Sequence, residues 1–219
     1  MLFTVRQRLF AIVGGAILAL LITGLIGVLG SRQVADELEF TDENIIRSLA
    51  ILSSVERDFL LIRVNALYHL SYDDAQRKAP HEATIRRNIA EIRERLAEYG
   101  KDLAVNARDR ELLASDEALL AVYLDALDRV LDASRRHDRE QAVIIIESEW
   151  KPAGERLTAA FAEHMRYKER LVDQVVQQSM QTGRRTALII IVATIAGILF
   201  VLAAAWLFRR SLPRGPGDT

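Results

Sequence analysis

The histidines are the residues of this chain that could bind a metal ion, but their neighbours do not form a metal site. None of them has a Glu three residues before it, which is the pattern with which helical bundles hold two bridged metal ions. His137 adjoins Asp138 and Glu140 in a charged segment that is typical of solvated surface. His164 lies on an apolar helical stripe and is expected to be a core or interface histidine. We expect no metal and no cofactor at the four histidines, which are His69, His81, His137 and His164.

Composition and motifs give no indication of catalysis or of nucleic-acid binding. The chain has no cysteine, which excludes disulfides, thiolate catalysis and zinc knuckles. It has no Gly-rich phosphate loop and no motif that places a nucleophile on a strand-to-helix turn. The 29 Lys and Arg residues are interspersed with 30 Asp and Glu residues, so no basic patch for nucleic acid is formed. We therefore expect a protein that is not an enzyme, with no catalytic residue.

Three arginines interrupt apolar neighbourhoods in the first half of the chain, namely Arg47, Arg57 and Arg63. The planar guanidinium group is suited to binding carboxylates, so these residues could hold a small anionic molecule. Each could instead pair with a neighbour such as Glu56 or Asp58, or point to water. The sequence leaves both interpretations open.

Two long apolar runs frame the segment that carries these residues. Residues 10–29 contain no charge, and at about 1.5 Å per residue roughly 20 helical residues span the roughly 30 Å of bilayer hydrocarbon. Residues 187–208 form a second such run. The first run is longer than the apolar core of about 7 to 15 residues in a signal peptide, and Val28-Leu29-Gly30 is a poor cleavage site. We interpret it as an uncleaved membrane helix.

The charges beside the apolar runs predict the orientation of the chain. Arg6 and Arg8 precede the first run, and Arg209, Arg210 and Arg214 follow the second, which places both tails in the cytoplasm. The predicted organisation is a cytoplasmic tail at 1–9, a membrane helix at 10–30, an outer domain at 31–185, a second membrane helix at 186–208 and a cytoplasmic tail at 209–219.

The first part of the outer domain has apolar residues on two helical faces. One face recurs at intervals of seven and is made of Leu38, Ile45, Leu52, Phe59 and Ala66. The other face is made of Ile46, Leu60, Leu61, Leu67 and Tyr68. We expect one helix that runs without a break for some forty residues past Gly30, with one face in the domain core and the other against a partner subunit.

Three further amphipathic segments follow. Apolar stripes run over 85–103 and 113–131, after expected connections at 71–80 and 134–140, and Asn106 can cap the helix that carries the second stripe. A fourth segment begins near Gln141, with a kink or a helix end expected around Trp150 because Pro152 follows, and then continues into the second apolar run. The predicted fold class is all-α, an up-and-down antiparallel four-helix bundle between two transmembrane helices.

This order of features resembles the periplasmic four-helix-bundle sensor domains of bacterial methyl-accepting chemotaxis receptors. The resemblance covers nearly the whole chain and is carried by Ile62-Arg63, the run Arg95-Leu96-Ala97-Glu98-Tyr99, Tyr123, Ala142, Pro152 and Arg209-Arg210. It implies an inner-membrane homodimer whose first helices meet. It also implies a ligand site formed by arginines of the first helix and a hydroxyl of the last, for which Arg57, Arg63 and Thr158 are the candidates.

The resemblance implies a module that detects a small anionic ligand, an organic acid or an amino acid, and shifts its second membrane helix. The spacing of Arg57 and Arg63 differs from that in the well-known amino-acid receptors, so the ligand class is not carried over. The cytoplasmic signalling part of such receptors does not follow Ser211, and we expect that this chain alone does not engage a kinase. Two alternatives stay open: a membrane-anchored adaptor or dimerisation protein without a ligand, and a sensor fragment of a histidine kinase or cyclase.

Overall fold

The computed structural model describes residues 5–210, with the side chains of 5–9, 11–12, 37–43 and 207–210 excepted. No strand occurs in this described range. The chain divides into two compact units, one formed by residues 40–174 and the other by residues 1–39 with 175–219. The predicted tails at 1–9 and 209–219, with their arginines, and the side chain of Leu38 fall outside the described side chains.

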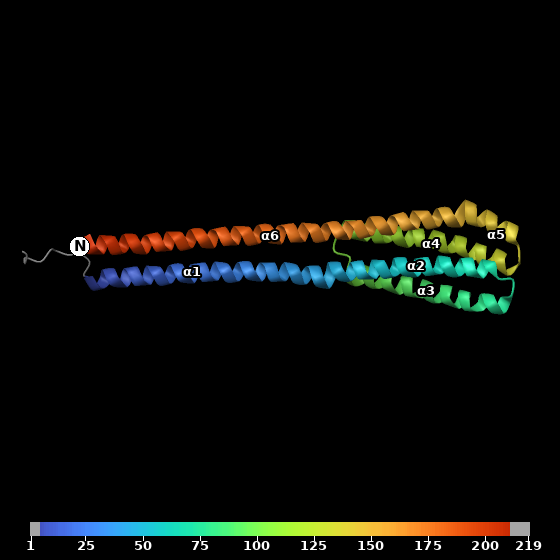
Figure 1. Cartoon of the computed structure of the whole chain (residues 1–219), viewed down its shortest axis with the longest axis horizontal. Coiled ribbons are helices and arrows are strands. Elements are labelled where there is room, and N and C mark those ends of the chain that lie inside the picture. Colours follow the sequence, from blue (N-terminus) through green and yellow to red (C-terminus); the bar gives the residue numbers. More distant parts are fainter. Residues whose placement is uncertain (1–4, 211–219) are drawn as a thin grey trace, which may run out of the picture. The chain divides into compact units, whose positions relative to one another are not determined.

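The unit of residues 40–174 is a four-helix bundle, which confirms the predicted fold class (Figure 1). Its first three helices are α2 (Arg47–Ser71), α3 (Ala75–Asp102) and α4 (Ala107–Arg135). The fourth combines α5 (Arg139–Ile145), the π-helical segment η2 (Ile146–Trp150) and the first part of α6 (Lys151–Arg210). Short connections between antiparallel neighbours are typical of this architecture.

Side-chain caps define where three of these helices begin. Asp74 accepts a hydrogen bond from the backbone N–H of Gln76 at the start of α3, and Asn106 accepts one from Asp109 at the start of α4. Asp138 does the same for Gln141 in α5. These carboxylate and amide oxygens satisfy backbone donors that have no partner within the helix. The predicted cap at Asn106 and the predicted turn at 134–140 are therefore confirmed.

One predicted boundary is wrong. The connection expected at 71–80 is shorter, because α3 already begins at Ala75 and contains Pro80. The missing N–H of Pro80 leaves the carbonyl of residue 76 without its usual partner. The helix expected to run without a break past Gly30 is helical as far as Ser71, but it includes a π-helical segment η1 (Thr41–Ile46) between α1 (Val5–Phe40) and α2. A π-helical turn holds one extra residue, which the apolar pattern does not indicate.

Pro152 affects the fourth helix as expected, but without a gap. The chain stays helical through η2 and into α6, whose second residue is Pro152. Because the chain is already helical before Pro152, its missing N–H leaves a carbonyl of the preceding turn without a helical partner, and the irregular winding of η2 lies at this point. The expected irregularity around Trp150 is therefore a π-helical segment.

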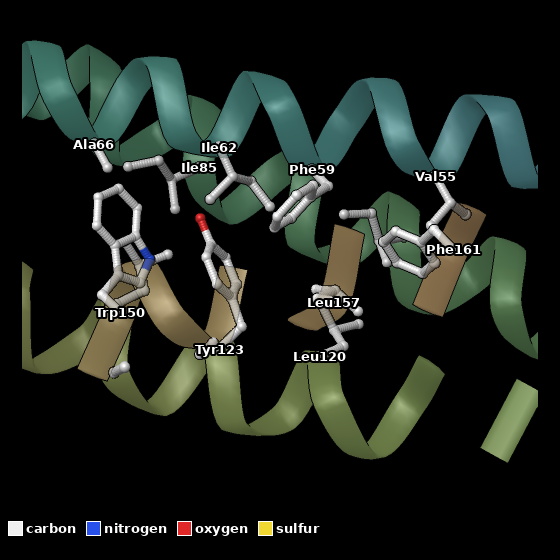
Figure 2. Close-up of a cluster of buried hydrophobic side chains, with 14 of the residues drawn as sticks. Val55, Phe59, Ile62, Ala66, Ile85, Leu120, Tyr123, Trp150, Leu157 and Phe161 are labelled. Carbon is white, nitrogen blue, oxygen red and sulfur yellow. The ribbon is translucent and has the colours of Figure 1, made fainter. Parts of the chain in front are cut away.

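Aromatic side chains fill the middle of the bundle core (Figure 2). The ring of Phe59 on α2 meets the ring of Tyr123 on α4 edge to face, with centroids 4.8 Å apart, and lies 6.0 Å from that of Phe161 on α6. Trp150 stacks on Tyr123 at 5.7 Å. Such ring pairs stabilise a core beyond the effect of the area they bury. These four side chains, defined here as the aromatic layer, join α2, α4 and the fourth helix.

The predicted apolar stripes lie in this core. On α2 they are Leu52, Val55, Phe59, Ile62 and Ala66, all at most 1% exposed. The second apolar face of α2 is exposed, as the two-faced pattern predicted, with Leu67 57% and Tyr68 51% exposed. Within the described bundle, α2 therefore presents an apolar face that is largely exposed, with the Tyr68 ring stacked on His81 of α3.

In the other unit, α1 and the last part of α6 run antiparallel. Gly15 lies beside Phe200, while Gly30 lies beside Thr186. A Cβ atom at position 30 would come within 2.5 Å of Cγ2 of Thr186, so only glycine permits this approach. Among the described residues, two helices are long and apolar enough to cross a membrane by length and composition, in Val13–Asp36 and in Arg139–Trp206.

Phe59→Ala is expected to lower the free energy of unfolding by about 3–5 kcal/mol, because it removes the ring that joins Tyr123 to Phe161. Thermal and denaturant unfolding of the full chain in lipid nanodiscs, followed by circular dichroism, measures the change. Val122→Ala is the matched control, since Val122 adjoins Tyr123 on α4 but is 51% exposed. Equal effects of the two substitutions would contradict the placement of the aromatic layer.

Candidate functional site

The exposed apolar face of α2 is the surface that the sequence predicts to meet a partner subunit, and it includes Arg57, one of the three candidate ligand residues. It consists of residues three or four positions apart, and we define it as the α2 outer stripe: Arg57, Leu60, Leu61, Val64, Leu67 and Tyr68. This spacing puts all six side chains on one side of the helix. A contiguous apolar surface on a helix marks a site of interaction with another molecule.

Arg57 is partly engaged within its own helix. Its side chain is 62% exposed, and its Nε lies 3.2 Å from Oδ1 of Asp58. Asp58 is only 2% exposed and also binds Arg95 of α3 through Oδ2. The pairing with Asp58 considered from the sequence is therefore present for Arg57. Because Nε makes this contact, the two terminal nitrogens of this largely exposed guanidinium group keep their donor capacity for an anion.

Arg63 lies next to the aromatic layer, whereas Thr158 is a half-buried residue of α6. The guanidinium carbon of Arg63 is 5.8 Å from the centre of the Phe59 ring, a cation–π distance. The hydroxyl of Thr158 donates a hydrogen bond of 2.8 Å to the carbonyl oxygen of Gly154, one turn earlier in α6. This hydroxyl keeps its acceptor capacity for a ligand.

No hydrogen bond joins Arg57, Arg63 and Thr158 to one another in the described part of the chain. Arg57 belongs to the α2 outer stripe, Arg63 contacts the aromatic layer from α2, and Thr158 lies on α6. A ligand that contacts all three would have to extend from the outer face of α2 to α6. Within one described chain, no contact joins the three candidates, and Arg57 lies on the outer face.

Sequence reasoning missed a buried polar network at the end of the bundle where α3 joins α4. We define it as the Asp109 network: Tyr99, Asp109, Asp116, His164 and Lys168, each at most 1% exposed. Oδ1 of Asp109 accepts from the Tyr99 hydroxyl at 2.7 Å and faces Nε2 of His164 at 3.0 Å. Oδ2 accepts from Nζ of Lys168 at 2.7 Å and from the backbone N–H of Val105 at 2.9 Å.

The second carboxylate of this network faces the other side of the imidazole ring. Oδ2 of Asp116 lies 2.6 Å from Nδ1 of His164. Its Oδ1 has no hydrogen-bond partner among the residues that the structure describes. The expected core histidine at 164 is confirmed, but its surroundings are ionic. The available signal was the occurrence of Asp109, Asp116 and Lys168 at helical spacing on the apolar stripes.

A second polar cluster lies at the opposite end of the bundle, where α2 joins α3. Oε1 of Glu82 faces Nε2 of the buried His69 at 2.9 Å and accepts from Nε of Arg135 at 2.9 Å. The hydrogen bond with Arg135 holds the pKa of Glu82 at about 2, although burial acts in the opposite direction. Burial lowers the pKa of His69 below its ordinary value, and its hydrogen bond to Glu82 only partly offsets this. His69 is therefore neutral near pH 7.

The described residues contain no group of three or more His, Cys, Asp or Glu side chains arranged to hold a metal ion. The two clusters are instead pairs of opposite charges. An arrangement of this kind can hold helices in register and can bind or release protons.

Comparison with known proteins gave one family. A family model described as a four helix bundle sensory module for signal transduction matches residues 2–182. The match includes the bundle, the α2 outer stripe and both polar clusters. Neither the curated proteins nor the solved structures contain a match to the chain.

Glu82→Gln is expected to reduce the acid sensitivity of the fold. Because the pKa of Glu82 is depressed in the folded state, its stabilising contribution is present above about pH 4.5 and is lost as the pH falls towards about 2. The thermal midpoint of the wild-type chain should fall over this interval, and that of the variant should fall less. Glu94→Gln, an exposed carboxyl on the same helix, is the control and should keep the wild-type acid dependence. An unchanged acid dependence in Glu82→Gln would refute the role of this carboxylate.

Proposed function

Because the chain belongs to the four-helix-bundle sensory modules for signal transduction, we propose that its bundle detects a small anionic molecule outside the cytoplasm and passes a conformational shift through α6. The sequence resemblance to chemoreceptor sensor domains is confirmed at the level of this family, which is a signalling family. The ligand class, the membrane topology and the oligomeric state are parts of the proposal.

The α2 outer stripe is the observation that supports this function best. It combines exposed apolar side chains such as Leu60 and Leu67 with the exposed guanidinium group of Arg57. In a two-fold homodimer, the same stripe from each copy would meet its partner and bury this apolar area. Two Arg57 side chains would then lie at one interface, where an organic acid or an amino acid carboxylate can bind both.

The proposed output element is α6, which contributes to both units of the chain. Its first residues carry Thr158 and the Asp109 network partners His164 and Lys168, and its last residues belong to the second apolar segment. A helix responds to a local displacement as a stiff element, so a ligand contact near Thr158 can bias its position. A ligand produces such a shift only by binding one state more tightly than the other.

We further propose that the two apolar helices cross the bacterial inner membrane and that the bundle lies in the periplasm. The length and apolarity of both helices and the arginines beside them support this orientation. Protease protection in spheroplasts tests the proposal: the bundle should be cleaved from outside, and a bundle cleaved only after lysis would exclude it.

Leu67→Cys is expected to form a disulfide-linked dimer, because residues on a two-fold interface meet the same residues of the other copy. The natural chain has no cysteine, so the introduced thiol has no competitor. Non-reducing electrophoresis after mild oxidation of membranes measures the dimer. Val122→Cys, similarly exposed on α4, is the control and should form no disulfide-linked dimer. Equal cross-linking at both positions would count against the stripe as the interface.

Arg57→Ala and Arg63→Ala are each expected to weaken binding of an anionic ligand by about 10- to 100-fold, because each removes a charge-assisted hydrogen bond. Thermal shift with a panel of organic acids and amino acids, followed by calorimetry on the full chain in nanodiscs, measures this. Arg87→Ala is the control, since Arg87 is an exposed arginine of α3. If no anion raises the thermal midpoint and the arginine variants match the wild type, the adaptor function without a ligand is favoured.

A further inference from the structure

The Asp109 network contains more ionisable groups than a packing role requires. Two carboxylates, an imidazole, an ammonium group and a phenol lie together, and none of the five side chains is more than 1% exposed. Hydrophobic residues of similar size would fill the same space without the cost of removing charges from water. The ligand site proposed on α2 uses none of these groups. We therefore considered what their protonation states allow.

The hydrogen-bond geometry around His164 accommodates an extra proton. Nδ1 faces Asp116 at 2.6 Å and Nε2 faces Asp109 at 3.0 Å, so both ring nitrogens are directed at carboxylate oxygens. A neutral imidazole can donate from only one of its nitrogens. Both contacts are hydrogen bonds when the pair of His164 and Asp116 holds one proton beyond that of a neutral imidazole. The arrangement therefore fits a bound proton, with the imidazolium cation between two carboxylates as its charged form.

Charge balance gives the same result. With one proton in the His164–Asp116 pair beyond that of a neutral imidazole, two negative and two positive charges are present and the network is neutral. Without that proton, the network carries a net charge of minus one in a region with no exposed side chain. An unbalanced buried charge is strongly unfavourable, so loss of the proton must change the contacts of the network.

Tyr99 provides an alternative arrangement for the deprotonated state. Its hydroxyl lies 2.7 Å from Oδ1 of Asp109 and 2.8 Å from Nε2 of His164. When His164 is protonated, the hydroxyl donates to Asp109. When Nε2 has lost its proton, the hydroxyl can rotate and donate to that nitrogen. Asp109 then loses two of its four donors and keeps Lys168 and the N–H of Val105.

We propose that the Asp109 network is a proton-binding site through which this sensory module also responds to alkaline pH. Protonated His164 ties α6 to α4 through both carboxylates, and deprotonation releases one of these ties at the residue where α6 meets the start of α4. The stimulus is the proton, and it acts at a site separate from the α2 outer stripe. That the change is read as a signal rests on the proposed function, whereas the proton site itself does not.

The electrostatic surroundings favour the protonated form near neutrality. Burial alone would lower the pKa of His164, but hydrogen bonds to Asp109 and Asp116 outweigh it and raise the pKa above its ordinary value. Burial also raises the pKa of Asp116, an effect that His164 only partly offsets. Both directions keep the shared proton on the pair. The His164 contribution to stability is complete below about pH 6.5 and is lost as the pH rises through the raised pKa.

Groups from every neighbouring helix enter this balance. Helix α2 contributes the buried hydroxyl of Ser48, which faces Tyr99, and no charge. Helix α3 contributes Tyr99 itself. Helix α6 contributes Lys168 and, from further away, Glu163, whose charge disfavours ionisation of Asp116. Within the described bundle, Asp109 is therefore the anion that faces His164 on its other side, and Lys168 is the cation bound to Asp109.

The first test titrates the wild-type chain in lipid nanodiscs with no ligand added. Histidine side chains labelled with nitrogen-15 report their own protonation by NMR. We expect His164 to carry both ring protons at pH 7 and to titrate above about 6.5. A His164 ring that is neutral at pH 7 would overturn the proposal. Asp116→Asn should shift the His164 titration downward by about one unit or more, because it removes a charged partner, and an unchanged titration would equally overturn it.

The second test follows the movement of α6. Spin labels on Glu94→Cys and Ala159→Cys, both exposed, report the distance between α3 and α6 in the cysteine-free background. We expect the distance distribution to change over the pH interval in which His164 titrates, and to be pH-independent there in His164→Gln. His81→Gln, which keeps the network, should behave as the wild type. A distance distribution that stays the same over the pH interval in which His164 titrates would refute the coupling. Loss of anion binding alone would refute only the ligand proposal.

Discussion

A carboxylate removed from water has to be paired, and Asp109 meets this requirement by drawing together separate segments of the bundle. Its four donors come from α3, from the connection before α4 and from two turns of α6. Removing charges from water has a free-energy cost that offsets much of their mutual attraction in the core. Such a network therefore contributes more to the register of the helices than to net stability. The rest of the bundle can then be packed with apolar side chains, since the relative heights of α3, α4 and α6 are already set at this end.

The two polar clusters lie at opposite ends of the bundle and respond to pH in opposite directions. Acidification protonates His69, whose pKa is lowered, and eventually Glu82, so it weakens the end where α2 joins α3. Alkalinisation removes the shared proton from His164 and weakens the other end. The aromatic layer between them contains no group that titrates near neutrality, so it can hold the helices together while either end loosens. The fold is therefore expected to be most stable between these two limits.

Periodicity predicted most of this bundle, because a helix must bury a continuous stripe. The apolar stripes that contain Leu52, Ile92 and Leu127 lie in the core, and the second apolar face of α2 is exposed as expected. Periodicity could not predict η1, because an apolar pattern is too coarse to register one extra residue in a turn. It also missed the Asp109 network, since residues 109 and 164 come together only in the folded chain. Arg57, Arg63 and Thr158 remain predictions as ligand residues.

The π-helical segment η2 lets the fourth helix hold one more residue than a regular helix of the same height. Deleting one residue from Ile146–Trp150 would therefore restore a regular helix of that height, in which Ala142 and Ile145 still face the core. Loss of one residue elsewhere in this helix would instead turn one side of it by about 100° about the axis and move its buried side chains out of the core. The segment Ile146–Trp150 is therefore the place in the fourth helix where a one-residue deletion should need no change of sequence on either side.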